Sequence, residues 1–428
     1  MDFALSEEQE RLQGAARDLL ARECPMERVR KIAAEPSGHD PALWRAFAEA
    51  GWLGVLVPEA HGGAGLALLD AAVLLHELGR AVAPGPFLAS SVAAVVALRE
   101  AGTRAQQERW LPRLASGEAV ATVALFDGVD ARPDGDALGG TAAPARGGFA
   151  LDGTRTFVPY GALADLVIAA FRTRAASSAR GAAAAAGRRA RGGASRAPAG
   201  RDRNAAQRAG AGGPGRAPAR GAASWRGVGL FAVPGTARGL RKTALVSVDA
   251  TQRDAELAFR RVAVARDAAL GGANGAGDAA RAIARVLDAC AIAVAADSLG
   301  GAERALERAV AYVKVREQFG RPVGSFQAVQ HMAAEAAARI EPARALLWYA
   351  AWAFDARPRE APLAAAMAKA ACCDVYRAVA RTAVEMHGGV GFTWENDMHF
   401  HLKRSLANAA AFGEADWHRE RVAEATLD

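Results

Sequence analysis

The sequence predicts a multidomain α+β fold, in which helical N-terminal and C-terminal domains flank a middle β-domain. Apolar residues recur at helical spacing in the first and last parts of the chain, but they alternate or form short runs in the middle. The chain has 428 residues, of which 51% are hydrophobic and 23% charged, so it is globular and long enough for two or three domains. We place these domains at residues 1–118, 119–272 and 273–428.

The N-terminal domain is expected to be helical. Ser6 is suited to cap a first helix, because acidic residues follow it in the first turn and complement the helix dipole. Leu12 and Ala16 then recur at helical spacing, and residues 70–80 and 88–101 repeat the pattern between Gly and Pro residues.

The middle domain is expected to consist of strands. Residues 149–158 predict a hairpin with a tight turn at Asp152-Gly153. Two short apolar runs, 166–171 and 228–233, and an alternating segment, 256–264, predict further strands.

Residues 174–226 interrupt this domain with a segment rich in Ala, Gly, Arg and Pro. The segment has almost no large apolar residue before Trp225, so we expect a disordered insertion. An out-of-frame stretch of a GC-rich coding sequence is the alternative explanation. Twelve arginines and one acid, Asp202, give the segment a charge of +11, and the rest of the chain of net charge +7 is therefore at −4. The overall charge is thus no argument for a nucleic-acid surface.

The C-terminal domain is expected to be a bundle of long antiparallel helices. Residues 279–319, 329–354 and 362–386 lack internal proline except Pro342, which is expected to kink or end its helix.

Two segments of this domain are typical of a ligand site. Arg316-Glu317-Gln318-Phe319-Gly320, followed by Gln327, places a cation, an amide and an aromatic ring together. Glu385-Met386-His387-Gly388-Gly389 continues into Val390-Gly391-Phe392, where glycines allow a ligand to approach the backbone closely. A cation beside a Gly-Gly turn suits a dinucleotide pyrophosphate. Neither segment follows a predicted strand, so this is not a Rossmann fingerprint.

The order of these motifs resembles that of the acyl-CoA dehydrogenase family, whose members use FAD. The resemblance extends over nearly the whole chain except residues 174–226. The chain is similar to bacterial members of the family in which the Glu-Gly-Thr catalytic stretch is altered. The N-terminal half carries further matching segments: Gly51-Trp52-Leu53-Gly54, Pro58-Glu59, Gly62-Gly63-Ala64-Gly65, Glu77-Leu78-Gly79-Arg80 and Trp110-Leu111-Pro112.

The resemblance implies which residues bind FAD. It implies that Arg316 binds a phosphate of FAD and that Phe319 packs near a cofactor ring, in both cases on a neighbouring subunit, so that a homo- or hetero-oligomer (dimer or tetramer) is expected. The remaining expected cofactor residues are Gln318, Gln327, Glu385, Gly388, Gly389 and Phe157, the last of which stands where the family carries an aromatic residue against the flavin.

The sequence departs from the family pattern at the points that decide catalysis. Pro159 replaces a threonine whose hydroxyl usually bonds flavin N5, and Glu385 replaces a more usual glutamine. The family's catalytic glutamate has two known locations. At one the chain has Gly413-Glu414 in reversed order, and at the other it has Cys290, with Asp288 nearby. Glu414 is the expected catalytic base.

The expected function is FAD-dependent α,β-dehydrogenation of an acyl-CoA thioester. A base removes the α-proton, the β-hydride goes to flavin N5, and an electron-transfer flavoprotein or similar acceptor reoxidises the flavin. Two alternatives stay open: a half-site or non-catalytic FAD-binding subunit of a hetero-oligomeric enzyme, and a DNA-associated flavoprotein homologue.

The remaining composition predicts a cytoplasmic protein with no metal site. The four cysteines lack Cys-x-x-Cys spacing, which fits a reducing compartment, and His399 and His401 are two residues apart, so they diverge on a helix. No secretory leader opens the chain, and no apolar run reaches the ~20 residues of a membrane span.

Overall fold

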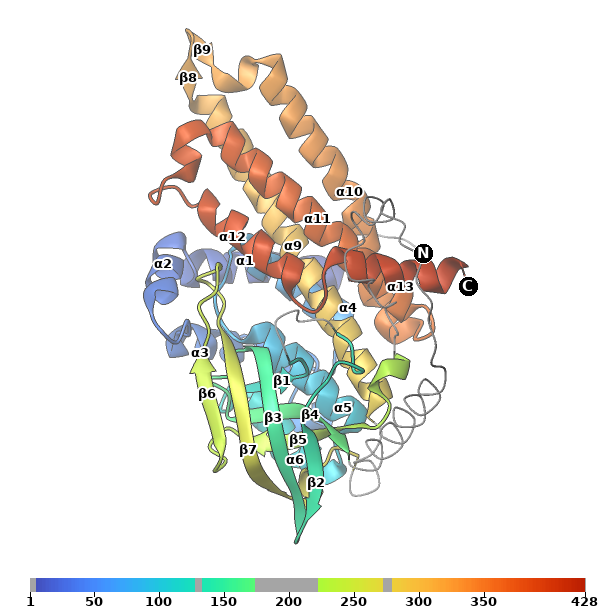
Figure 1. The fold of residues 1–428 in the computed structure, drawn as a ribbon. Coiled ribbons are helices and arrows are strands. Elements are labelled where there is room, and N and C mark those ends of the chain that lie inside the picture. The colour runs from blue at the N-terminus through green and yellow to red at the C-terminus, as the bar shows by residue number, and fades with distance from the viewer. Residues whose placement is uncertain (1–4, 128–132, 174–221, 272–278, 428) are drawn as a thin grey trace, which may run out of the picture.

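The computed structural model describes residues 5–127, 133–173, 222–271 and 279–427. A bundle of long helices forms one end of the molecule, a sheet forms the other, and the N-terminal helices lie between them (Figure 1). This is the predicted fold class. Among the described residues, no helix combines the length and the hydrophobicity that crossing a membrane requires.

The N-terminal part is helical, as predicted. Its helices are α1 (Glu7–Glu23), α2 (Met26–Ala34), α3 (Pro41–Glu49), α4 (Leu68–Arg80), α5 (Val95–Ala101) and α6 (Arg104–Ala115), and a π-helical segment, η3 (Leu88–Ala94), leads into α5. Ser6 caps α1 in a capping box with Gln9, which confirms that prediction. Helix α4 is buried along most of its length because it packs against the first helix of the C-terminal bundle.

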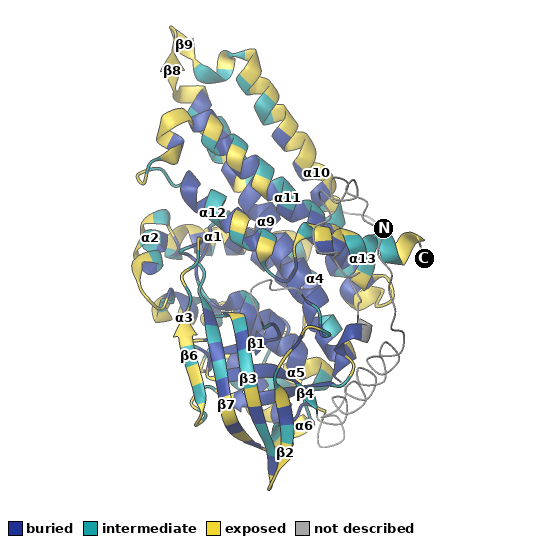
Figure 2. Cartoon of the chain, viewed as in Figure 1, coloured by how far each residue is buried: buried dark blue, intermediate teal, exposed yellow. Residues whose placement is uncertain are grey.

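The middle part is a seven-stranded sheet. Its strands are β1 (Ala121–Ala124), β2 (Thr141–Ala145), β3 (Gly148–Pro159), β4 (Leu166–Thr173), β5 (Val228–Pro234), β6 (Leu240–Ala244) and β7 (Asp254–Ala265). Their order is β1-β4-β2-β3-β7-β6, with β5 antiparallel to β4. Buried residues of the strands form a core of their own, and the outer residues are exposed (Figure 2).

The C-terminal part is a bundle around a 36-residue helix, α9 (Ala280–Val315). A short hairpin of β8 (Glu317–Gln318) and β9 (Arg321–Pro322) joins α9 to α10 (Gln327–Ala356). The chain returns through α11 (Ala361–His387), the turn η7 (Gly388–Phe392), α12 (Met398–Ala410) and α13 (Ala415–Leu427). Helix α9 is buried because α4 covers one side of it and α11 another.

The predicted turn at Asp152-Gly153 is wrong. Strand β3 runs through both residues, and the hairpin turn lies at Arg146-Gly147, between the paired residues Ala145 and Gly148. Gly153 is needed for another reason. A Cβ there would come 2.8 Å from the Cα of Gly140, and the pairing with β7 shifts register at this point.

Two further predictions concern Pro342 and the segment 174–226. Helix α10 continues through Pro342 instead of ending there. Most of the segment predicted to be disordered, residues 174–221, lies outside the described residues. Its last part was wrongly included, because Ala222–Trp225 forms a 3-10 turn with Trp225 only 1% exposed.

Candidate functional site

A cavity of about 100 Å³ lies where the N-terminal helices, the sheet and the C-terminal helices meet. Its wall includes Pro159 of β3, the position at which the resemblance places a flavin contact. The volume is below the roughly 300–1,000 Å³ typical of pockets that enclose small-molecule ligands. This chain's own cavity is therefore too small to enclose such a ligand.

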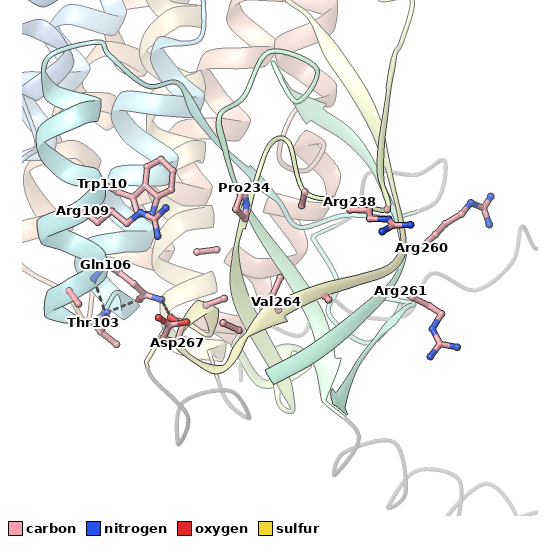
Figure 3. Close-up of a pocket in the computed structure, with 17 residues that line it drawn as sticks. Thr103, Gln106, Arg109, Trp110, Pro234, Arg238, Arg260, Arg261, Val264 and Asp267 are labelled. Atoms are coloured by element: carbon pink, nitrogen blue, oxygen red, sulfur yellow. Dashed lines mark hydrogen bonds between the residues drawn. The ribbon is translucent and has the colours of Figure 1, made fainter. Parts of the chain in front are cut away.

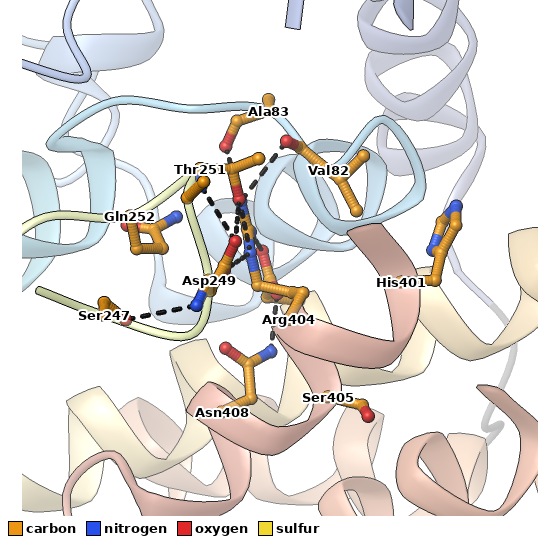
Figure 4. A network of polar contacts seen from close by, with 12 residues as sticks. Val82, Ala83, Ser247, Asp249, Thr251, Gln252, His401, Arg404, Ser405 and Asn408 are labelled. Atoms are coloured by element: carbon orange, nitrogen blue, oxygen red, sulfur yellow. Dashed lines mark hydrogen bonds and ion pairs between the residues drawn. The ribbon is translucent and has the colours of Figure 1, made fainter. Parts of the chain in front are cut away.

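A buried arginine fills the polar side of this cavity (Figure 4). Arg404 of α12 is 1% exposed, and its guanidinium donates hydrogen bonds to Asp249 at 2.6 Å and Asp297 at 2.8 Å. It also donates to Thr251 and to the backbone carbonyl of Ala83. The carboxylates hold the pKa of Arg404 above its usual value despite burial. Arg404 is thus a charged group whose donors are engaged within the protein.

Asp254 is the titratable carboxyl of the cavity that is best suited to proton transfer. It begins β7 directly opposite Pro159. Burial, with the nearby Asp249 carboxylate, raises the pKa of Asp254 to about 6. A carboxyl with a pKa near neutrality is matched to general-base work.

The segment between α12 and α13 presents an aromatic ring to the cavity and no carboxylate. Phe412 is buried, with its ring 5.9 Å from that of Phe126. Gly413 has φ +97°, and a Cβ there would lie 2.7 Å from the ring of Trp417. The buried Lys369 of α11 fixes this segment by donating to the carbonyls of Asn408 and Gly413, at 3.0 and 3.1 Å.

Neither of the two positions at which the family is expected to carry its catalytic glutamate supplies a carboxylate to the cavity wall in this chain. Glu414, the predicted base, is exposed just before α13, and the cavity is lined there by Ala411 and Phe412. At the second location, Cys290 is fully buried within α9, and burial raises the pKa of its thiol. Asp288 is ion-paired with Arg421 at 2.8 Å. The role of Glu414 stays a prediction that the geometry does not favour.

Phe157 lies on β3, two residues before Pro159 of the cavity wall. It sits in the irregular stretch of β3 between Arg155 and Val158, has φ +51°, and is 38% exposed. The ring is thus partly accessible to solvent, and its contact with a flavin stays a prediction. The following Pro159 offers no donor, and its carbonyl accepts a hydrogen bond from Thr122 at 2.6 Å.

The other predicted cofactor residues gather at the far end of the C-terminal bundle. Arg316, Gln318, Phe319, Gln327, Glu385, Gly388 and Gly389 are all exposed there. The β8–β9 hairpin forms the tip of this end, remote from the sheet (Figure 1). Within one chain, Phe157 and Pro159 are therefore separated from the tip residues.

The tip is held rigidly by packing beneath it. Tyr312 of α9 stacks on His387 of α11, with ring centroids 4.5 Å apart, which joins the hairpin to the Gly-Gly turn. A small core that includes Val313, Met386 and Met398 lies under both segments. The exposed tip residues thus lie on a packed core.

The chemistry of the tip fits an anionic, planar ligand such as FAD. Arg316 has no ion-pair partner among the described residues, and Phe319 is 91% exposed. A Cβ at Gly388 or Gly389 would meet no atom within 4 Å, so the backbone there is accessible. In the part of the chain that the structure describes, no cluster of three or more His, Cys, Asp or Glu side chains could hold a metal.

Sequence reasoning missed the network around Arg404 and the position of Asp254 in the cavity wall. One signal was present: Asp297 follows eight apolar residues, 289–296, inside a helix, and a charge in such a run must be paired. Asp249 and Asp254 carry no such signal, because only the tertiary fold brings their loop and strand to the cavity.

Family models match both helical parts of the chain. The model described as "Acyl-CoA dehydrogenase, N-terminal domain" matches residues 6–118, and "Acyl-CoA dehydrogenase, C-terminal domain" matches residues 277–427. Among curated relatives, "Acyl-CoA dehydrogenase IpdE2" of Mycobacterium tuberculosis is 29% identical over 405 residues, covering 94% of this chain and 92% of its own length.

Solved structures agree in fold. The ChsE4–ChsE5 complex from Mycobacterium tuberculosis superposes with a TM-score of 0.80 at 26% identity, covering 100% of this chain and 99% of that one. A single-residue variant of the Tcur3481–Tcur3483 steroid ACAD gives a TM-score of 0.78 at 31% identity and covers 99% of both chains.

Proposed function

The chain belongs to the acyl-CoA dehydrogenase family, and from this membership we propose that it is an FAD-binding subunit of a hetero-oligomeric acyl-CoA dehydrogenase. In this proposal the chain donates its tip to an FAD held by a partner subunit. The partner supplies the catalytic base and the acyl-CoA pocket.

The exposure of the tip carries the proposal. Phe319, at 91% exposed, is among the most exposed large apolar side chains of the described residues, and Arg316 beside it has no ion-pair partner among them. Val315 and Phe392 at the same end of the bundle are also largely exposed, and a group of exposed apolar side chains marks an interaction site. Because the chain's own sheet is remote, the ligand of Arg316 and Phe319 belongs to another subunit.

The side chains that fill the chain's own cavity support the same proposal. Arg404 is engaged by two carboxylates, Phe412 is packed on Phe126, and about 100 Å³ is left. Gly413 has no space for a larger side chain beside Trp417. Dehydrogenation requires a base and an open pocket, and these side chains occupy the space where both would lie.

The proposed contribution to the reaction is binding and orientation. FAD accepts the hydride when it is bound. Arg316 would neutralise a phosphate of that FAD, and the Gly388-Gly389 backbone would approach it closely. Two of the solved relatives are named as pairs of chains, which is the arrangement proposed for this chain.

One observation favours a second candidate, a chain that is itself catalytic. Asp254 lines the cavity beside Pro159 with a pKa raised to about 6 by burial, and it could accept a proton in place of the family's glutamate. The partner would then be a second copy, and the cavity would have to widen for substrate.

Acyl-CoA-dependent acceptor reduction by the chain, alone and co-expressed with homologous chains, distinguishes the two. The proposal predicts activity only with a heterologous partner, a loss of at least about tenfold for Arg316→Ala, and no change for Asp254→Asn or Glu414→Gln. Activity of the isolated chain that Asp254→Asn abolishes would favour the second candidate instead.

A further inference from the structure

A second cavity, of about 700 Å³, opens between α6 and the sheet (Figure 3). One wall is α6, and the others are the β5–β6 turn, β7 and the 3-10 turn after β7. It shares no lining residue with the cavity around Arg404. Its volume lies within the roughly 300–1,000 Å³ of small-molecule sites.

The groove is preformed, because a buried side chain locks its two walls together. Gln106 of α6 is 8% exposed, and its amide nitrogen donates to the carbonyls of Asp267 at 2.7 Å and Ala269 at 3.3 Å. Its amide oxygen accepts from the backbone of Thr103, which caps α6. Helix α6 is thereby fixed to the segment that follows β7.

The floor of the groove is apolar and smooth. It consists of small side chains from the sheet, with Trp110 on the α6 side, and these residues are Ala232, Pro234, Ala237, Ala263, Val264 and Ala268. Trp110 is 6% exposed and lies between the guanidinium groups of Arg109 and Arg113, which are 5.2 and 5.1 Å from its ring centroid.

The lining carries an excess of positive charge. Four arginines and a single acid, Asp267, line the groove. None of the four, Arg109, Arg238, Arg260 and Arg261, has an ion-pair partner within the described ranges. By contrast, Arg104 and Arg113 of the same helix α6 are each paired with a glutamate at 2.7 Å. The groove arginines are therefore free to bind an external anion.

The arginines differ in where they point. Arg109 lies on the α6 side of the groove and Arg238 on the opposite side, whereas Arg260 and Arg261 extend away from it into solvent (Figure 3). In Figure 3 the Arg238 side chain runs away from α6 toward Arg260, so Arg109 is the arginine placed to contact a bound group, and the other three raise the local positive potential.

We propose that this groove binds a small anionic amphiphile, with its apolar body on the alanine, proline and valine floor and its carboxylate or phosphate at Arg109, on the α6 side. The apolar floor excludes purely ionic ligands, the charge excludes cationic ones, and the preformed shape limits the ordering cost of binding. The site is distinct from the FAD-binding tip, so it does not depend on the function proposed for the tip.

Calorimetric titration of the full chain, as purified with any bound partner, tests this. Dodecanoate and dodecyl phosphate, both below their micellar concentrations, distinguish a carboxylate from a phosphate ligand. We expect at least one of them to bind, with the dissociation constant raised about tenfold in Arg109→Ala/Arg238→Ala and raised also by salt. Ala237→Glu, which adds a carboxylate to the floor, should weaken binding similarly.

The matched control is Arg22→Ala/Arg45→Ala, which removes two exposed arginines outside the groove and should leave binding unchanged. Dodecyltrimethylammonium, with the same tail and the opposite charge, should bind at least tenfold more weakly. The proposal is overturned if neither anion binds below about 1 mM, if the cation binds equally well, or if the control variant weakens binding as much as the groove variant.

Discussion

Phe319 occupies a backbone position that suits asparagine or glycine better than an aromatic residue. It and Gly320 form the two-residue loop between β8 and β9, with φ of +56° and +77°. Loops with positive φ at both positions favour Asn-Gly, because a bulky side chain is strained there. A strained, exposed aromatic residue at a tip indicates that the ring is retained for binding.

Replacing Phe319 should therefore separate stability from function. Phe319→Asn is expected to leave the free energy of unfolding unchanged or to raise it by up to about 1 kcal/mol, because strain is relieved. The same variant should lower the FAD content of the assembly. Thermal unfolding and flavin absorbance measure the two effects, and a variant that loses stability while keeping its flavin would show that the ring has a structural role.

Asp254 should make stability depend on pH in a predictable direction. Its pKa is raised from 3.8 to about 6 in the folded state by burial, so the folded chain holds this proton more tightly than the unfolded chain. The contribution of Asp254 to stability is then greatest below about pH 4 and falls as the pH rises to about 6, by about 2–3 kcal/mol at most. Asp254→Asn removes this dependence.

The difference in melting temperature between Asp254→Asn and the wild type should thus be small near pH 4 and largest above about pH 6. Asp18→Asn, at an exposed position of α1, is the control and should give no such trend. A difference that is constant across this range would mean that Asp254 titrates normally.

At the scale of elements, the interface between α4 and α9 contains a buried cluster of charges. His76 of α4 lies between two carboxylates, 3.2 Å from Glu77 and 3.1 Å from Glu303 of α9. Arg17 of α1, Arg80 of α4 and Arg344 of α10 also belong to the cluster, at 2.8, 3.1 and 2.9 Å from these carboxylates. Burial alone would lower the pKa of His76, but the two carboxylates outweigh it and raise that pKa.

A raised pKa means that protonated His76 stabilises the fold fully below its unfolded pKa of about 6.5, and that this stabilisation is lost as the pH rises through the folded pKa. His76→Asn is expected to cost about 1–3 kcal/mol at about pH 5.5 and less at about pH 9. Urea unfolding at both pH values measures this, with His331→Asn, an exposed histidine of α10, as control. An equal cost at both values would argue against a charged His76.

The elements were predictable where the local pattern decides the structure. The long helices α9, α10 and α11 follow from uninterrupted apolar periodicity, and Ser6 from its cap chemistry. The turn at Asp152-Gly153 was not predictable, because the same dipeptide serves a tight hairpin or a bulge where two strands approach closely. Only the close approach of Gly140, which is more than ten residues away in the sequence, distinguishes the bulge from the hairpin turn.

The whole molecule is held together at Arg404. This side chain of α12 bonds Asp249 and Thr251 of the β6–β7 loop, Asp297 of α9 and the carbonyl of Ala83 after α4. Its removal leaves two buried carboxylates without their counter-charge. Arg404→Met should therefore cost about 3–5 kcal/mol of unfolding free energy.

Chemical denaturation measures that cost, with Arg45→Met on the exposed side of α3 as control. Adding Asp249→Asn and Asp297→Asn to Arg404→Met should recover part of the loss, because no unpaired charge then remains buried. A loss below about 1 kcal/mol for Arg404→Met would contradict the role of Arg404 as the junction of the three parts.

The grouping of residues at the candidate site was predictable only in the half formed by the tip. The tip residues around Arg316 and Phe319 are contiguous in sequence, so their motif can be recognised without knowledge of the fold. The cavity half depends on Asp254, Asp297, Arg404 and Phe412, which lie on separate elements and converge only in the folded chain. Glu414 was chosen from its place in the sequence, and its exposed position is set by the turn at Gly413, with φ +97°.

The ratio of FAD to chains in the purified assembly distinguishes a half-site subunit from an enzyme made only of this chain. For a half-site subunit we expect half as many FAD molecules as chains in a complex with a homologous partner, loss of that FAD in Arg316→Ala, and none bound by this chain alone. One FAD per chain in an assembly made only of this chain, retained in Arg316→Ala, would contradict it.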